Sequence, residues 1–269
     1  MHLLDGPIGT ELARRGVCLP LPAWSANANL THPDIVYDIV RDYVAAGATS
    51  FITNTFRTTP TSMGDEWRRG LIAAVQLSRS AIPPTAQLLG SLAPVDDCYR
   101  PDLSPPDAED RHRVVAQALA DAGVDAILCE TFAHPGEAVA AVRASVATGL
   151  PVWLALTPGP HATLMSPSAL RRVGAEAFEA GAKCVLVNCV DHRLAESYVQ
   201  ALASLGGRWG AYPNAGEDFG VVPLHRARRA GLAKRMVRWR DQGAHALGLC
   251  CGFTPQDLAR LAVRLVKRG

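Results

Sequence analysis

The sequence predicts an α/β fold, a single (β/α)8 TIM barrel that takes up residues 1–269 as one domain. Three observations support this prediction: short apolar runs alternate strictly with longer helical patterns, glycines recur at helix ends, and the length suits eight such units. Because alternation alone does not establish that the sheet closes, a doubly wound open sheet stays the alternative.

Eight short apolar runs between turn signals are predicted to be the strands. In chain order they cover residues 2–5, 50–55, 87–92, 124–129, 152–156, 183–188, 209–212 and 245–249. The helical segments between and after them cover residues 33–46, 69–82, 106–122, 135–148, 167–180, 192–205, 228–242 and 255–267. Eight strand–helix units in about 250 residues are the size of one closed barrel.

Several of these helices carry start and stop signals. Proline stands near the first turn at Pro33, Pro135, Pro167 and Pro255. Thr254 and Ser166 each precede such a proline and are expected to cap the helix. Glycine follows four predicted helices, at Gly47, Gly123, Gly181 and Gly243. A glycine in that place adopts the left-handed cap conformation and turns the chain into the next strand.

Composition narrows the class of protein. Hydrophobic residues make up 48% and charged residues 19% of the 269, which suits a large packed core. The formal net charge is +2 without a long basic run, so we expect no nucleic-acid partner. No apolar stretch is long enough for a membrane span, and the first residues do not read as a secretion signal. We therefore expect a cytoplasmic protein without a membrane partner; the sequence does not indicate an oligomeric state.

The cysteines carry the strongest functional signal. Seven cysteines without an export signal favour metal binding or catalysis over a disulfide framework. Cys189 ends one predicted strand, and Cys250 and Cys251 follow another. Three protein ligands leave zinc a fourth position for substrate, which is typical of a catalytic site. Four cysteines have no motif spacing and are expected to be buried apolar residues or incidental surface thiols: Cys18, Cys98, Cys129 and Cys184.

The barrel prediction also restricts where the other functional residues can lie. Active sites of such barrels form at the C-terminal ends of the strands. Polar or cysteine residues in that position are Asp5, Thr55, Glu130, Cys189, Tyr212, Asn214, Cys250 and Cys251. The eight histidines show no ligand spacing, so His134, His161 and His192 are expected to be solvated loop residues. The cluster 226–229 is expected to be a solvated helix start, with binding of an anionic donor as the alternative.

Seven stretches together resemble the homocysteine S-methyltransferase family, in the order that the family has them. They are Asp5-Gly-Pro-Ile-Gly-Thr-Glu-Leu12, Thr53-Asn-Thr-Phe56, Leu89-Gly-Ser-Leu-Ala-Pro94, Glu130-Thr-Phe132, Val187-Asn-Cys189, Tyr212-Pro-Asn-Ala-Gly-Glu217 and Leu249-Cys-Cys-Gly252. The opening Asp-Gly motif is weak alone. Asn-Cys followed about 60 residues later by Cys-Cys-Gly, with Tyr-Pro-Asn between them, is specific.

The resemblance implies that a zinc ion (Zn2+) binds Cys189, Cys250 and Cys251. It also implies that Asp5, Thr55 and Glu130, with backbone groups near Gly6, hold the amino-acid end of homocysteine. Asn214 matches a loop that reaches the metal in part of the family when substrate is absent. Simpler roles stay open for single residues: Glu130 could cap a helix, the Asp5 loop could be a plain turn, Thr55 could bond within its loop, and Tyr212 could belong to the core.

The implied reaction is methyl transfer from a small sulfonium donor, S-methylmethionine or S-adenosylmethionine, to the homocysteine thiol, which gives methionine. No catalytic residue beyond the zinc site is expected, and one barrel leaves no room for a cobalamin or folate module. Leu186 and Leu249 stand where the family usually has glycine, and the loop 95–106 looks short. These departures leave two alternatives: methylation of another thiol or a selenol, and a non-catalytic barrel that binds zinc and a thiol. A barrel for phosphorylated substrates is the weaker idea, since no convincing glycine-rich phosphate loop follows the seventh and eighth strands.

Overall fold

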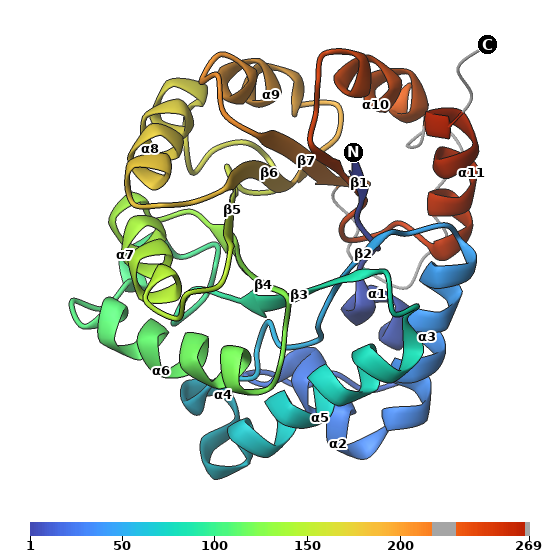
Figure 1. The fold of residues 1–269 in the computed structure, drawn as a ribbon, viewed down its shortest axis with the longest axis vertical. Coiled ribbons are helices and arrows are strands. Elements are labelled where there is room, and N and C mark those ends of the chain that lie inside the picture. Colours follow the sequence, from blue (N-terminus) through green and yellow to red (C-terminus); the bar gives the residue numbers. More distant parts are fainter. Residues whose placement is uncertain (217–229, 267–269) are drawn as a thin grey trace.

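The eight strands form one parallel sheet that closes into a barrel (Figure 1). The structure is a computed structural model and describes residues 1–216 and 230–266. The strands are β1 (His2–Leu3), β2 (Ser50–Ile52), β3 (Gln87–Leu92), β4 (Ala126–Phe132), β5 (Val152–Leu156), β6 (Cys184–Asp191), β7 (Trp209–Asn214) and β8 (Ala246–Leu247). Neighbours in the chain are neighbours in the sheet, and β1 pairs with β8. A bridge between Leu4 and Ser50 joins β1 to β2, so the closed barrel is confirmed and the open sheet is excluded.

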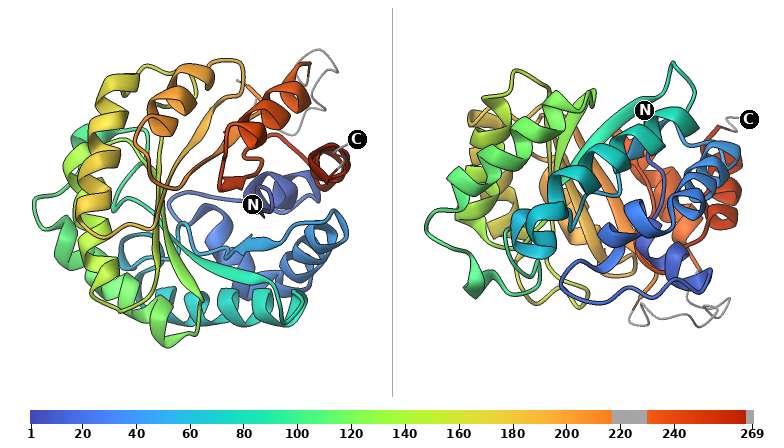
Figure 2. Two further views of the ribbon diagram at one scale, coloured as in Figure 1. Left: turned by 45° about the horizontal axis from the view of Figure 1, so that its top comes forward. Right: turned by 90° about the horizontal axis from the view of Figure 1, so that it is seen from below.

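In the described residues, eight helices correspond to the predicted ones, and they surround the barrel (Figures 1 and 2). They are α3 (Pro33–Ala45), α5 (Trp67–Ala81), α6 (Ala108–Asp121), α7 (Pro135–Val146), α8 (Pro167–Glu179), α9 (Glu196–Ala203), α10 (Leu232–Asp241) and α11 (Pro255–Val266). The largest differences are at the starts of α9 and α10, which begin four residues after the predicted positions 192 and 228. The predicted role of the cluster 226–229 lies outside the described residues.

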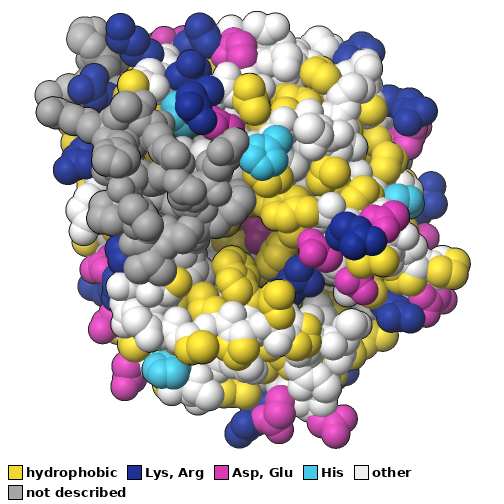
Figure 3. All heavy atoms as spheres, turned by 180° about the vertical axis from the view of Figure 1, so that it is seen from behind, with side chains coloured by type: hydrophobic (Ala, Val, Ile, Leu, Met, Phe, Trp, Pro, Cys, Tyr) yellow, Lys and Arg dark blue, Asp and Glu magenta, His cyan; other side chains and the backbone are white. Residues whose placement is uncertain are grey.

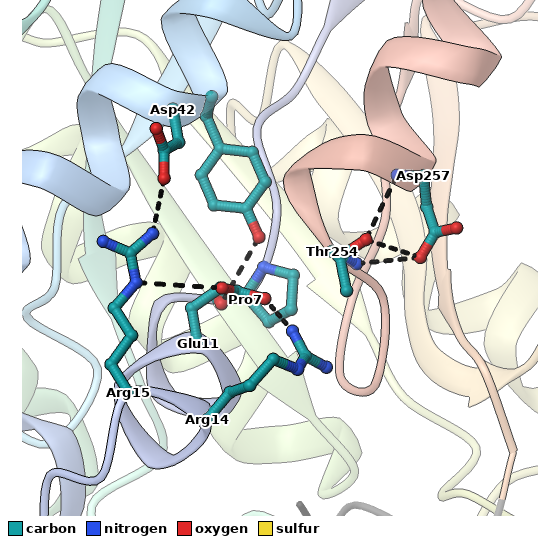
Figure 4. A network of polar contacts seen from close by, with 8 residues as sticks. Pro7, Glu11, Arg14, Arg15, Asp42, Thr254 and Asp257 are labelled. Atoms are coloured by element: carbon teal, nitrogen blue, oxygen red, sulfur yellow. Dashed lines mark hydrogen bonds and ion pairs between the residues drawn. The ribbon is translucent and has the colours of Figure 1, made fainter. Parts of the chain in front are cut away.

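The predicted helix signals act as expected. Gly47, Gly123, Gly181 and Gly243 have φ angles of +92°, +89°, +106° and +93°, in the left-handed range. Ser166 Oγ accepts a hydrogen bond from Ala169 N over 3.2 Å at the start of α8. At the start of α11, Thr254 Oγ1 accepts from Asp257 N over 3.2 Å, and Asp257 accepts in return from Thr254 N (Figure 4). This reciprocal capping box satisfies donors that a helix start leaves unpaired.

Several short elements were not predicted. They are α1 (Ile8–Arg14), α2 (Ala28–Thr31), α4 (Pro60–Met63) and the 3-10 turns η1 (Trp24–Asn27), η2 (Gly64–Glu66) and η3 (Pro101–Leu103). Apart from α1, each is too short for a helical period to be recognised. The segment from α1 to α2 lies after β1, on the side where the strands end, and supplies part of the site described below.

Alternating side chains of the strands fill the barrel interior. This inner layer comprises Leu4, Leu89, Ala126, Leu128, Trp153, Ala155, Cys184, Leu186, Tyr212 and Ala246. Residues of opposite parity, such as Ile127 and Val185, pack outward against the helices. At the strand starts the rings of His2, Trp153 and His245 contact one another, with centroids 4.9–5.6 Å apart. These rings cover the lower end of the inner layer.

None of the helices in the described residues is both long enough and apolar enough to cross a bilayer.

Candidate active site and sulfur cluster

A cavity of about 360 Å³ opens at the C-terminal ends of the strands. This volume is in the range of small-molecule sites. Figure 3 looks onto this face of the barrel and shows a hollow among mostly apolar side chains. Of the predicted site residues, Asp5, Gly6, Glu130, Cys189, Cys250 and Cys251 line the cavity. The cavity therefore contains the residues at which a barrel would be expected to carry out chemistry.

The strand ends hold the three cysteines in place by backbone hydrogen bonds. Cys189 lies in a bulge of β6, where the register with β7 shifts and its φ angle is +50°. The Asn214 side chain secures this bulge, because its Nδ2 donates to Cys189 O over 3.0 Å. Cys250 N donates to Pro213 O over 2.9 Å, and Cys251 O accepts from Ala215 N over 3.0 Å. The end of β7 thus contacts both cysteine-bearing segments.

The three sulfur atoms are close enough to share one metal ion. All three lie within 4.8 Å of one another, and no other group of this kind was found among the described residues. The Cys189–Cys250 and Cys250–Cys251 sulfur separations are 2.8 Å and 4.0 Å. Sulfurs bound tetrahedrally to one zinc ion lie roughly 3.8 Å apart, given Zn–S bonds of about 2.3 Å. The donor set fits a soft metal ion, and the cavity leaves one side of the cluster open to a fourth ligand.

The three thiols differ in acidity because they hydrogen-bond to one another. Hydrogen bonds from Cys189 and Cys250 to the Cys251 sulfur lower the pKa of Cys251 well below its ordinary value. The corresponding bonds, donated to its neighbours, raise the pKa of Cys250. Thr131 adds a further contact from β4: its hydroxyl lies 4.0 Å from Cys189 Sγ and accepts from Asn188 Nδ2 over 2.7 Å. Of the three thiols, Cys251 is the one whose pKa is lowered.

Two carboxyl groups lie in the cavity beside the sulfurs. Glu130 accepts hydrogen bonds from Ser91 Oγ over 2.9 Å and from Tyr212 Oη over 3.1 Å. Loss of hydration raises its pKa to about 7, although these two hydrogen bonds act in the opposite direction. Asp5 is 1% exposed, and its burial raises its pKa well above the ordinary value. Asp5 Oδ2 accepts from Ile52 N over 3.1 Å, whereas Oδ1 has no hydrogen-bond partner among the described residues.

The turn after Asp5 is shaped by close packing. A Cβ atom at Gly6 would lie 2.6 Å from the Tyr43 ring, so this position requires glycine. Tyr43 Oη donates to Pro7 O over 3.5 Å. Figure 4 shows how α1 is held beside this turn: Glu11 contacts Arg14 and Arg15, and Arg15 reaches Asp42 in α3. The Asp5–Gly6 turn is therefore fixed from both sides.

Two predicted binding residues lie beneath the cavity surface. Thr55 is 1% exposed; its hydroxyl contacts Thr53 Oγ1 at 2.7 Å and donates to Ser91 O over 2.7 Å. Asn214 is fully buried and bonds to Cys189 O and Gly216 N. Neither is in the cavity lining, although Thr53 and Cys189, their partners, are. A direct contact of Thr55 or Asn214 with substrate or metal stays a prediction.

A further part of the cavity lining, called the aromatic wall below, was not assigned a role from the sequence. It is formed by Trp24, Phe56, Arg57, Asp97, Cys98 and Tyr99. Trp24 and Phe56 meet edge to face with centroids 6.3 Å apart, and the Arg57 guanidinium lies over the Phe56 ring at 5.6 Å. Arg57 also donates to Asp96 O over 3.1 Å, which links the loops after β2 and β3. Only the length of the loop after β3 had drawn attention to this wall.

Some expectations for single residues need correction. His192 was expected to be solvated, but it is fully buried. His161 is exposed as expected, whereas His134 is half-buried and its Nδ1 caps α7 by accepting from Glu137 N.

Tyr212 belongs to the inner layer and also lines the cavity, so it has both a core and a site position. Leu249 lines the cavity, but Leu186 lies in the inner layer outside the lining.

The other four cysteines lie where they were expected. Cys129 and Cys184 are buried apolar residues and Cys18 is exposed. Cys98 is also buried, at 7% exposure, although it borders the cavity. Burial raises the pKa of Cys98 to about 12, so this thiol stays protonated.

Comparison with known proteins gives consistent results. The sequence matches the family described as homocysteine S-methyltransferase over residues 2–265. It is 31% identical to the homocysteine S-methyltransferase of Escherichia coli (strain K12), with 97% of this chain and 94% of that protein covered. It is 24% identical to the selenocysteine Se-methyltransferase of Brassica oleracea var. italica, with coverages of 99% and 89%. The metallated form of the homocysteine methyltransferase MmuM from Escherichia coli superposes with a TM-score of 0.84 at 26% identity, with coverages of 98% and 96%.

Proposed function

The chain belongs to the homocysteine S-methyltransferase family, and from this we propose that it transfers a methyl group from a sulfonium donor to the thiol of homocysteine, giving methionine. We further propose that a zinc ion held by Cys189, Cys250 and Cys251 is its cofactor. The observation that carries this proposal is the trio of sulfur atoms within 4.8 Å of one another in the lining of a cavity that also contains two carboxyl groups. When bound, zinc would lower the pKa of the substrate thiol and so supply a thiolate at neutral pH.

The two carboxyl groups support recognition of the amino-acid end of the acceptor. Glu130 is near its point of half-ionisation at neutral pH, and an approaching ammonium group favours the carboxylate. The resulting charge-assisted hydrogen bond holds the ammonium group. Asp5 Oδ1, buried and unpaired at the cavity, offers a second partner for the same group. Together they orient the acceptor with its sulfur toward the cysteine cluster.

The aromatic wall supports a small cationic donor. Aromatic faces attract cations, and Trp24 and Tyr99 provide such faces here, whereas the Phe56 ring already carries the Arg57 guanidinium. Asp97 offers a partner for a donor ammonium group and Arg57 one for a donor carboxylate. S-methylmethionine carries all three groups, and S-adenosylmethionine carries them with a bulkier substituent. We therefore place the donor against this wall, with the acceptor at the carboxyl groups.

The proposed reaction balances without a further reactant. The acceptor thiolate forms the new S–C bond with its own electron pair, and the S–CH3 bond of the donor breaks. That bonding pair stays on the donor sulfur, which becomes a neutral thioether. The thiol proton goes to solvent, and no proton leaves the methyl group. Alignment of the two reactants at about 3–3.5 Å is expected to supply much of the rate.

A donor screen tests the proposal. Reduced, zinc-loaded protein is incubated with homocysteine and, in turn, with S-methylmethionine, S-adenosylmethionine, betaine and methyltetrahydrofolate. We expect methionine from a sulfonium donor only. Tight homocysteine binding without methionine from any donor would instead support the non-catalytic alternative, a barrel that binds zinc and a thiol.

Selenocysteine is the second candidate acceptor. The similarity to a selenocysteine Se-methyltransferase favours its inclusion, and Leu249 in the lining changes the cavity near the sulfurs. The same screen is therefore run with selenocysteine in place of homocysteine. The ratio of the two kcat/KM values decides which acceptor the enzyme prefers. Since seven free thiols suit a reducing compartment, we place this activity in the cytoplasm.

A further inference from the structure

Segment 95–104 connects β3 to α6 and brings Asp97, Cys98 and Tyr99 into the cavity wall. Short-range hydrogen bonds set its internal shape: Tyr99 N donates to Asp97 Oδ1, and Arg100 N donates to Asp97 O, each over 2.9 Å. Asp96 and Asp97 are exposed, whereas Val95 and Cys98 are buried against the barrel. Near the middle of the segment, Asp96 O accepts a hydrogen bond from Arg57. Further polar contacts hold the segment at its two ends.

Glu137, in the first turn of α7, provides those contacts. Its Oε1 accepts a hydrogen bond from Val95 N over 2.8 Å, and its carboxylate also accepts one from the Ser104 hydroxyl. One side chain therefore binds the first and the last residue of the segment. Glu137 is 4% exposed, so solvent has little access to replace a lost contact. A buried hydrogen-bonded carboxylate is costly to leave without its partners.

His112, in α6, completes the arrangement. Its Nε2 lies 3.1 Å from Glu137 Oε1, and its ring packs edge to face on Phe132, with centroids 5.6 Å apart. Phe132 ends β4, two residues after Glu130. Burial acts to raise the pKa of Glu137, but the hydrogen bonds from His112 and Val95 N outweigh it and the pKa is lowered. The pair thus ties the segment to the strand that carries the acceptor-binding carboxylate.

We propose that Glu137 and His112 are positioning residues that hold segment 95–104 against the barrel and thereby set the shape of the donor side of the cavity. Neither side chain lines the cavity, so they act through Asp97, Cys98 and Tyr99. The assignment of this side to the donor rests on the proposed function. The attachment of the segment does not, and it can be tested separately.

The chain contains a natural reporter of this attachment. Cys98 lies inside the segment and is 7% exposed, so its reaction with a thiol reagent should become faster when the segment moves away. Cys18 is exposed and Cys129 is buried beside Ser145, so they report reagent activity and global unfolding. Zinc-loaded protein is treated with iodoacetamide, and the labelling rate of each cysteine is measured by peptide mass spectrometry. Glu137→Gln should label Cys98 about tenfold faster, with Cys18 and Cys129 unchanged.

Two further variants complete the test. Ser104→Ala releases one end of the segment and should give a smaller increase at Cys98. Asp125→Asn is the matched control, since its carboxylate accepts from Leu88 N over 2.7 Å at the opposite end of β3, and it should leave Cys98 protected. A Cys98 rate in Glu137→Gln within twofold of the parent, with Cys129 still protected, overturns the attachment. If Cys129 also becomes reactive in Glu137→Gln, that variant has unfolded globally. The Cys98 labelling rate in Ser104→Ala then decides, and a rate within twofold of the parent overturns the attachment.

Kinetics then test the effect on the donor. Glu137→Gln should raise the KM of the sulfonium donor several-fold and leave the homocysteine KM and the zinc content unchanged. Equal increases in both KM values, or none in either, would contradict the assignment to the donor side. A parent protein inactive with every donor would refute the proposed function instead, while the labelling result would still decide whether Glu137 holds the segment.

Discussion

Tyr212 donates a hydrogen bond across the barrel to Glu130, with 3.1 Å between the phenol oxygen and Oε2. Ser91, on the neighbouring strand, donates a hydrogen bond to the other carboxylate oxygen of Glu130. Both bonds favour the charged form of Glu130, whereas its loss of hydration favours the neutral form, and the balance is a pKa of about 7. Three strands therefore determine the charge of the group proposed to bind the substrate ammonium.

Tyr212→Phe should weaken homocysteine binding most at neutral and lower pH. Removing a hydrogen bond to the carboxylate raises the pKa of Glu130 further, so a smaller fraction is charged at pH 7. We expect the homocysteine KM to rise about fivefold there and to approach the parent value well above that pH. KM measured from pH 6 to 9 checks this. An unchanged pH profile would show that the bond does not control Glu130.

Glu130→Gln is the companion variant. It should raise the homocysteine KM at every pH, by roughly tenfold or more at pH 8, because a charge-assisted hydrogen bond is lost. Zinc content, measured by elemental analysis, should be unaffected. Loss of zinc with an unchanged KM would assign Glu130 to the metal rather than the substrate.

Cys189→Ala should abolish both zinc retention and methyl transfer. Two remaining thiols hold the ion too weakly, while the fold should persist because the barrel core does not depend on a metal. Cys98→Ala is the matched control, a buried cysteine in the same cavity but outside the cluster, and it should keep one zinc per chain. Equal zinc content in the two variants would contradict the ligand assignment.

Asn214→Ala should lower zinc affinity by about tenfold, because it releases the carbonyl group that fixes the Cys189 bulge. Competition with a chromogenic chelator measures the affinity. Asn29→Ala, which removes a comparable bond from a buried amide to Asn54 O, is the control and should leave zinc affinity unchanged. A larger loss in Asn29→Ala than in Asn214→Ala would refute the specific role.

Arg57→Gln should raise the donor KM several-fold at an unchanged homocysteine KM, since Arg57 is the only basic residue in the cavity lining among the described residues. Arg100→Gln is the control, because Arg100 lies in the neighbouring loop and pairs with Asp102. Steady-state kinetics with both substrates varied separates the two KM values. An effect confined to homocysteine would reverse the proposed placement of donor and acceptor.

His245 should make stability fall in mild acid. Burial, together with the charges of His2 and Arg208, lowers its pKa to about 4, whereas the unfolded chain has an ordinary value near 6.5. The unfolded state therefore binds the proton first, and stability present above pH 6.5 is lost as the pH falls toward 4. His245→Asn should remove about one proton from the uptake on unfolding near pH 5. Urea unfolding measured between pH 4 and 7 tests this; an unchanged slope would contradict it.

The barrel could be predicted from the sequence because the signals for its helices and strands are local. A glycine such as Gly181 marks the end of a helix whatever the tertiary structure around it, and its φ of +106° is what its position predicted. The cysteine trio was found because strand ends meet on one face of a barrel. The predicted strand ends were less accurate, because β4 and β6 continue beyond the predicted residues through bulges at Thr131 and Cys189. Such bulges depend on pairing between strands, which no single segment reveals.

The donor wall and its supports could not be predicted for a similar reason. Trp24 reaches the cavity through the short turn η1 and the buried pair Asn29–Asn54, which joins residues 25 apart. Glu137 reads in the sequence as an ordinary acidic residue in the first turn of a helix. Its contact with Val95 spans 42 residues and exists only once the barrel has closed. Contacts of this kind are properties of the fold rather than of a motif.

The inner layer below the sulfurs has a kinetic consequence. Leu89, Leu128 and Leu186 fill the barrel interior, and the rings of His2, Trp153 and His245 cover its lower end. Both reactants must therefore enter, and both products must leave, through the same opening at the strand ends. Because the acceptor groups are less exposed than Asp97, homocysteine should bind before the donor, and the methylated acceptor should depart after the demethylated donor, an ordered sequential scheme rather than a random one.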